Sequence, residues 1–190
     1  MIVVISPEQG VALETYWVNR LLEEGLERFH VRKPSLDDSA VIEYLKQIDS
    51  AYYSKLVLQD RPHVATDFDL TRFHYSEKER NGILVKDEHK SLFSTSVHSV
   101  DEFNTLGCFW DSAFLSPIFP SISKTGYGVD TAIAKQLKLR TNHKTKLIGL
   151  GGITPQNMQE VLALGVDGVA LLGAIWQSEN PLQTFKLCKK

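Results

Sequence analysis

Residues 146–175 read KLIGLGGITPQNMQEVLALGVDGVALLGAI, and this stretch decides the fold expected for the chain. The apolar run Leu147–Leu150 is typical of a buried parallel strand. After a glycine pair, Thr154 and Pro155 suit the N-cap and the first position of a helix, which Gly165 would end. A second apolar run follows, so the stretch is predicted to be a strand, a helix and a parallel strand.

Both strands of this unit end in small residues. The first runs into Gly151-Gly152, and the second, Gly168–Leu172, runs into Gly173. In (β/α)8 barrels the loops after the last two strands present backbone N–H groups to a phosphate, and small residues let the anion approach closely. The alternative is that these glycines serve only tight turns and helix-on-sheet packing. Two such ends in succession, late in the chain, favour the phosphate site.

The composition is that of an ordinary globular protein without a nucleic-acid partner. The chain has 190 residues, of which 43% are hydrophobic and 23% charged, with a net charge of −2. We expect one domain, residues 1–190, which is small for a barrel, whose usual size is about 250 residues. No segment reaches the length of a membrane span or a signal sequence. Cys108 and Cys188 lack metal-ligand spacing, which favours a cytoplasmic protein with free thiols.

Apolar runs that alternate with helical patterns indicate six further strands. They are expected at Ile2–Ile5, Phe29–Val31, Leu56–Leu58, Thr71–Tyr75, Ser91–Thr95 and Ser112–Leu115. Other helices are predicted over Val11–Leu22, Asp37–Ile48, Thr131–Leu139 and Pro181–Cys188. This alternation predicts a compact α/β protein, a (β/α)8 TIM barrel. Because Ser76–Lys90 is short and highly charged, we expect a shortened fourth helix.

Polar side chains follow the predicted strands, on the rim where a barrel gathers its strand ends. They are His30, Arg32, Lys33, Gln59, Asp60, His74, Glu79, Ser96, His98, Ser121, Ser123 and Lys124. Cations and hydroxyls favour phosphoryl oxygens, and neighbouring carboxylates favour a Mg²⁺ ion that bridges those oxygens. Structural alternatives exist, namely a solvated pair for Arg32 and Lys33, and a hydrogen-bonded core histidine for His74. Asp60 also suits a helix cap or a local ion pair. The shared position of the set predicts an active site.

Five motifs resemble those of the thiamine phosphate synthase/TenI family. The loop SPIFPSISKTG (116–126) and the strand end LIGLGGI (147–153) are similar to the family's G-P-I-[FY]-P-T-x-T-K and G-G-I motifs. STSVHSVDEF (94–103) resembles its S-x-H-[ST] strand. FHVRKP (29–34) and LVLQDRPHVA (56–65) resemble its arginine-bearing strand two and its N-D strand three. The matches span nearly the whole chain in the family's order.

The resemblance implies a transferase of thiamine biosynthesis. It would join hydroxymethylpyrimidine diphosphate to hydroxyethylthiazole phosphate with loss of diphosphate, assisted by Mg²⁺. By motif, Arg32, Ser96 and Lys124 would hold the diphosphate, with Gln59 in place of the usual asparagine. Asp60 and Glu79 would be the metal carboxylates, and His74 would lie near the pyrimidine. The thiazole phosphate would be received by Ser121, Ser123 and the two strand ends, Gly151-Gly152 and Leu172-Gly173.

Strand two departs from the family pattern Q-x-R-x-K. His30 stands at the glutamine position, Pro34 stands at the lysine position, and Lys33 comes one residue early. A shift of one residue on a strand turns a side chain to the other face, so whether Lys33 reaches the diphosphate stays open.

Two other functions stay open besides the synthase. His30 and the SVHS run resemble the TenI branch, whose members isomerise the thiazole phosphate, with His98 as general acid and base. Asp60 and Glu79 favour the synthase, because a tautomerase has no evident need for them. The other alternative is a barrel that binds a thiamine precursor without catalysis. The sequence leaves a homo-oligomer possible.

Overall fold

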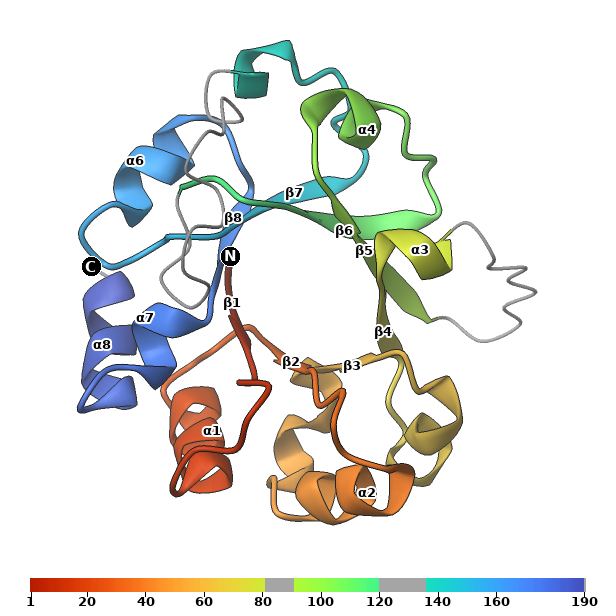
Figure 1. Cartoon of the computed structure of the whole chain (residues 1–190), viewed down its shortest axis with the longest axis vertical. Helices are drawn as coiled ribbons and strands as arrows, with labels where there is room; N and C mark the ends of the chain where they lie inside the picture. The colour runs from red at the N-terminus through yellow and green to blue at the C-terminus, as the bar shows by residue number, and fades with distance from the viewer. Residues whose placement is uncertain (81–90, 120–135, 190) are drawn as a thin grey trace.

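The computed structural model describes residues 1–80, 91–119 and 136–189, and its strands form a closed parallel barrel (Figure 1). The strands are β1 (Ile2–Ile5), β2 (Arg28–Val31), β3 (Leu56–Gln59), β4 (Arg72–Tyr75), β5 (Leu92–Val97), β6 (Trp110–Leu115), β7 (Lys146–Leu150) and β8 (Gly168–Leu171). Each pairs with the next, and β1 pairs with β8 to close the ring. All eight predicted strands are present, with ends no more than two residues from those expected. The (β/α)8 prediction is confirmed.

Helices surround the strands on the outside of the ring (Figure 1). They are α1 (Glu14–Glu23), α2 (Asp38–Lys46), α3 (Glu77–Arg80), α4 (Val100–Asn104), α6 (Met158–Ala163), α7 (Gly173–Trp176) and α8 (Pro181–Cys188), with 3-10 turns at Ser50–Lys55, Pro62–Phe68 and Leu137–Leu139. The described part of the segment after β4 holds the single turn α3, and the rest of the segment in which a shortened fourth helix is expected, residues 81–90, lies outside the described residues. Most of the helix predicted over Thr131–Leu139 lies outside the described residues, and its described end is a 3-10 turn.

Two helices start three residues later than predicted. Helix α1 begins at Glu14 instead of Val11, because the backbone of Leu13 is left-handed (φ 57°) and cannot continue a helix. Helix α6 begins at Met158 instead of Pro155, and the Thr154 side chain does not cap it. Instead, the Asn157 side chain accepts a hydrogen bond from the Thr154 amide (2.8 Å) and donates one to the Gly152 carbonyl (2.9 Å). Asn157 therefore fixes the loop directly after the glycine pair.

The strands separate two hydrophobic cores. The larger core lies between strands and helices, and the smaller lies inside the ring, made of Val3, Ile5, Phe114, Ile148 and Ala170. Apart from Val57 on β3, the buried side chains in the rest of the interior are polar, among them His30 on β2, His74 on β4 and Ser94 on β5. The ring interior is therefore apolar on the side of β1, β6, β7 and β8, and polar on the side of β2, β4 and β5.

Candidate active site

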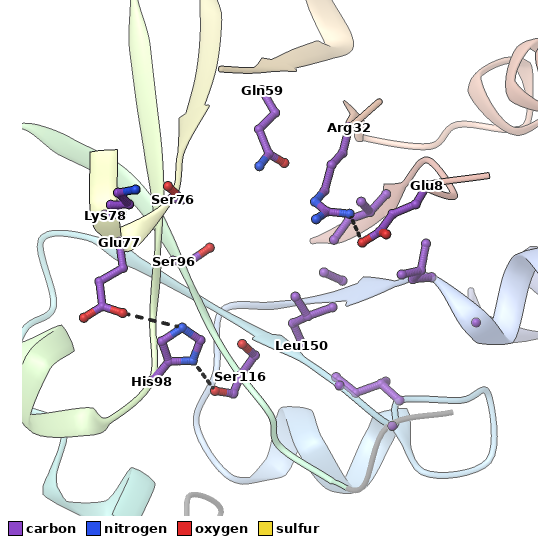
Figure 2. Close-up of a pocket in the computed structure, with 17 residues that line it drawn as sticks. Glu8, Arg32, Gln59, Ser76, Glu77, Lys78, Ser96, His98, Ser116 and Leu150 are labelled. Carbon is purple, nitrogen blue, oxygen red and sulfur yellow. Dashed lines mark hydrogen bonds and ion pairs between the residues drawn. The ribbon is translucent and has the colours of Figure 1, made fainter. Parts of the chain in front are cut away.

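A cavity of about 450 Å³ opens at the carboxyl ends of the strands (Figure 2). It brings together half of the sixteen predicted site residues, Arg32, Gln59, Ser96, His98, Gly151, Gly152, Leu172 and Gly173. This is the face on which (β/α)8 enzymes carry their active sites. The predicted residues Ser121, Ser123 and Lys124 lie outside the described part of the chain. The other five predicted residues, His30, Lys33, Asp60, His74 and Glu79, do not line the cavity.

Arg32 follows β2 and reaches the cavity wall, where its guanidinium forms an ion pair with Glu8. The backbone at Arg32 is held by Ser6, whose hydroxyl accepts from the Arg32 amide (2.8 Å) and donates to the Arg32 carbonyl (3.0 Å). Since the side chain is one-third exposed, the guanidinium remains accessible to an anion in the cavity.

Lys33 turns away from the cavity and is buried. Its ammonium donates to a Glu14 carboxylate oxygen (2.7 Å) and to the Pro7 carbonyl (2.7 Å). The Tyr44 hydroxyl donates to the other oxygen of Glu14 (2.7 Å). Lys33 is therefore engaged in a structural ion pair between the loop after β2 and the first residue of α1.

His30 and His74 lie beneath the cavity, inside the barrel. Burial holds the pKa of His30 well below its ordinary value, and the neighbouring His74 adds to the effect. Burial lowers the pKa of His74 to about 4, so both rings are neutral near pH 7. His74 contacts the hydroxyls of Ser94 (Nδ1, 2.9 Å) and Ser96 (Nε2, 3.0 Å). His74 is therefore a hydrogen-bonded core histidine, as the structural alternative proposed. Its Nε2 contact holds the Ser96 hydroxyl from inside the barrel.

Asp60 and Glu79 face each other beside the cavity, next to the lining residue Gln59. Partial burial, followed by the contact with Glu79, raises the pKa of Asp60 to about 7. Burial alone would raise the pKa of Glu79, but its contacts with Asp60 and Ser76 lower it, so Asp60 carries any shared proton. One Glu79 oxygen also accepts from the amide (2.9 Å) and the hydroxyl (2.6 Å) of Ser76, which makes a capping box for α3.

His98 lies at the edge of the cavity after β5. Its Nδ1 donates to the Ser116 carbonyl (3.0 Å), and a carboxylate oxygen of Glu77 lies 3.8 Å from its Nε2 (Figure 2). The carbonyl contact fixes the neutral ring with its proton on Nδ1, which leaves Nε2 as the nitrogen able to accept a proton.

The glycine-bearing ends of β7 and β8 form the opposite wall. Gly151 and Gly152 have positive φ angles of 103° and 63°, and a Cβ on Gly151 would lie 3.0 Å from the Pro117 Cα. Gly173 begins the one-turn helix α7, whose first amides have no acceptor within the helix. Backbone amides at two small-residue ends therefore offer an anion a close approach.

Five polar residues of the cavity were not predicted from the sequence, namely Glu8, Ser76, Glu77, Lys78 and Ser116. They lie in the segments that follow β1, β4 and β6, where no periodicity marks a residue's direction. The spacing Ser76-x-x-Glu79 was the one available signal, because it is the pattern of a capping box.

No group of three or more histidine, cysteine or acidic side chains suited to a metal occurs among the residues that the structure describes. In the same part of the chain, no helix has the length and hydropathy needed to cross a bilayer.

A family model described as thiamine monophosphate synthase matches residues 2–175 of the chain. The chain belongs to this family. A thiamine-phosphate synthase of Listeria innocua serovar 6a is 30% identical over 151 residues, which cover 76% of this chain and 70% of that protein. One of Lactococcus lactis subsp. cremoris is 20% identical over 154 residues, 80% of this chain and 71% of that protein.

Solved structures named for the same activity share the fold of this member of the thiamine monophosphate synthase family. The thiamine phosphate pyrophosphorylase of Bacteroides thetaiotaomicron matches with a TM-score of 0.80 and 25% identity, over 100% of this chain and 95% of that chain. That of Pyrococcus furiosus matches with a TM-score of 0.74 and 20% identity, over 99% and 93%. The second likeness, at its lower identity, concerns the fold alone.

Proposed function

We propose that this chain is a thiamine-phosphate synthase, which joins hydroxymethylpyrimidine diphosphate to hydroxyethylthiazole phosphate and releases diphosphate. One observation carries the proposal: in a chain of this family, the cavity places Arg32, Gln59 and Ser96 opposite the glycine-bearing ends of β7 and β8. A cation with polar neighbours suits the diphosphate. Small-residue strand ends suit a second phosphate.

The cavity wall that carries Arg32, Gln59 and Ser96 must stabilise the charge that develops on the diphosphate. As the bond from the pyrimidine methylene to the diphosphate breaks, negative charge grows on the leaving oxygens and positive charge on the carbon. The Arg32 guanidinium stabilises that negative charge, and Gln59 and Ser96 donate hydrogen bonds to the same oxygens. The thiazole nitrogen then attacks the carbon, so the protein acts mainly by positioning.

The thiazole phosphate belongs at the opposite wall. The ends Gly151-Gly152 and Leu172-Gly173 lack bulk on the cavity side and bring backbone amides to the phosphate. The motif resemblance adds Lys124 to the diphosphate site, and Ser121 and Ser123 to the thiazole phosphate site.

Mg²⁺ fits the carboxylate pair. Partial burial and the contact with Glu79 raise the pKa of Asp60, because two close carboxylates do not both ionise readily, and a divalent cation would relieve this repulsion. Mg²⁺ commonly binds through one or two carboxylates together with substrate phosphates. Bound there, it would neutralise charge on the departing diphosphate.

We also place the enzyme in the cytoplasm, in keeping with the free thiols of Cys108 and Cys188.

The test is direct. The purified chain is incubated with Mg²⁺ and both substrates, and thiamine phosphate is followed by fluorescence after oxidation to thiochrome. We expect product from the wild-type chain, and a kcat/KM about 100-fold lower in Arg32→Gln, because one preorganised charge contact to the leaving group is lost. Arg20→Gln, on α1 and outside the cavity, serves as the control. Absence of product with conversion of the thiazole phosphate tautomers would instead support a tautomerase that uses His98.

A further inference from the structure

The segment Ser6-Pro7-Glu8 is fixed to the β2 loop by its backbone and by one side chain. The Ser6 amide donates to the His30 carbonyl (2.9 Å), and the Ser6 hydroxyl bonds to the backbone of Arg32 on both sides. The Pro7 carbonyl accepts from the buried ammonium of Lys33 (2.7 Å). Glu8 therefore extends from a rigid support, and its position beside Arg32 follows from the fold.

The Glu8 carboxylate is paired with the Arg32 guanidinium, the group that is proposed to bind the diphosphate. Figure 2 shows Glu8 directed toward Arg32 at the cavity edge, with the ion pair marked between them. Within the described part of the cavity wall, the cationic side chains are those of Arg32 and Lys78. A carboxylate there resembles one phosphoryl group in charge and in its ability to accept from a guanidinium.

The Glu8–Arg32 pair is strong enough to orient Arg32 and weak enough to be displaced. Its side chains are 33% (Arg32) and 46% (Glu8) exposed, so water and salt screen the attraction. A diphosphate carries more negative charge than one carboxylate and offers more acceptor oxygens, so it is the stronger ligand for the guanidinium.

We infer that Glu8 is an intramolecular occupant of the diphosphate site, which keeps Arg32 oriented in the empty enzyme and is displaced by the diphosphate group. The inference rests on the proposed function for the identity of the anion. Glu8 thereby lowers the affinity of the site for diphosphate, both by competing for Arg32 and by its own negative charge.

The experiment measures binding of magnesium diphosphate to the full chain by titration calorimetry, separately from synthase activity. Because a partly exposed ion pair is weak, we expect Glu8→Gln to bind diphosphate about threefold to fivefold more tightly than wild type. Arg32→Gln should bind it at least about tenfold more weakly. Glu23→Gln breaks a similar exposed pair, with Arg20 on α1, and should bind like wild type.

Salt gives a second readout. The advantage of Glu8→Gln should shrink as the sodium chloride concentration rises from about 0.05 M to about 0.5 M. This change shortens the Debye length from about 14 Å to about 4 Å, so the competing ion pair of the wild type is screened. Urea unfolding midpoints verify that each variant is folded. Equal or weaker diphosphate binding by folded Glu8→Gln would overturn the inference, even if the wild-type chain makes thiamine phosphate. Lack of product beside tighter binding by Glu8→Gln would instead overturn the proposed function alone.

Discussion

Thr95 of β5 is fully buried, and its hydroxyl has no hydrogen-bond partner among the described residues. Its neighbours Ser94 and Ser96 point into the barrel and contact His74. Because side chains alternate along a strand, Thr95 points outward into the larger hydrophobic core. A buried hydroxyl without a partner loses its contacts with water and gains nothing in return.

Replacement of Thr95 by valine should raise the free energy of unfolding by about 1 kcal/mol, because a methyl group of similar size replaces the unpaired hydroxyl. Thr145→Val is the matched control: Thr145 is equally buried, but its hydroxyl accepts from the Asn142 side chain (3.3 Å). That variant should lose about 1 kcal/mol. Urea denaturation measures both, and a less stable Thr95→Val would contradict the prediction.

At the scale of elements, the end of β7 depends on a glycine for two separable reasons. Gly151 has a φ of 103°, and a Cβ there would also crowd Pro117. Gly165, at the end of α6, has a φ of 97° but open space around its Cα. Gly165→Ala therefore isolates the backbone strain, and Gly151→Ala adds the contact with Pro117.

We expect Gly165→Ala to lose about 1–2 kcal/mol of unfolding free energy from the left-handed conformation. Gly151→Ala should lose at least about 1 kcal/mol more, since the loop after β6 must move. It should also raise the KM for the thiazole phosphate, while Gly165→Ala leaves that KM unchanged. Equal destabilisation and equal KM values would show that Pro117 gives way freely.

The start of α1 and the loop after β2 are joined by the buried pair of Glu14 and Lys33, whose side chains are 7% and 3% exposed. Lys33→Met would leave the Glu14 carboxylate buried and without its cation, which should lower the unfolding free energy by about 3–5 kcal/mol. The double variant Lys33→Met/Glu14→Gln keeps an acceptor for Tyr44 and should recover most of the loss. A double-mutant cycle measured in urea tests this, and additive losses would refute the coupling.

The elements themselves were largely predictable, because buried parallel strands such as β8 are unbroken apolar runs. Helix starts were less predictable. Thr154 suited an N-cap by its sequence position, whereas in the structure the Asn157 side chain accepts a hydrogen bond from the Thr154 amide. Lys33 shows a different limit. Strand alternation assigns directions only within a strand, and β2 ends at Val31, so the direction of Lys33 was set by Glu14 far away in sequence.

At the scale of the whole molecule, the barrel interior carries two neutral histidines that make stability depend on pH. His30 and His74 have lowered pKa values in the fold, so protonation favours the unfolded chain. The contribution of these neutral rings to the free energy of unfolding is fully present above the pKa of histidine in the unfolded chain, about 6.5. It is lost as the pH falls from that value toward the pKa in the folded protein.

For His74 alone, with a folded pKa of about 4, we expect a loss of about 2 kcal/mol between pH 7.5 and pH 5. His30 adds a loss of the same sign. His74→Asn should flatten the pH dependence, whereas replacement of the exposed His143 by glutamine should leave it unchanged. Unfolding free energies measured from pH 7.5 to pH 5 decide this, and a flat wild-type profile would contradict it.

The site could be located from the sequence at the level of the rim, because a barrel brings all its strand ends to one face. The set of residues that line the site could not be predicted, since the direction of each side chain depends on loop packing across the whole ring. Glu8 is the clearest case: it enters the cavity because residues distant in sequence, at positions 30, 32 and 33, hold the backbone at Ser6 and Pro7.

Closure of the ring by β1 and β8 also governs when the protein can fold. Ile2, Val3 and Val4 find their last partners at Val169, Ala170 and Leu171, near the other end of the chain. During synthesis, β1 therefore keeps an unpaired edge until the ribosome has released β8. A nascent chain arrested before Gly168 exposes strand edges at β1 and β7, which are templates for self-association. Because this pairing joins segments far apart in sequence, we expect the ring to close late, and a chaperone that covers the two edges would protect the nascent chain until then.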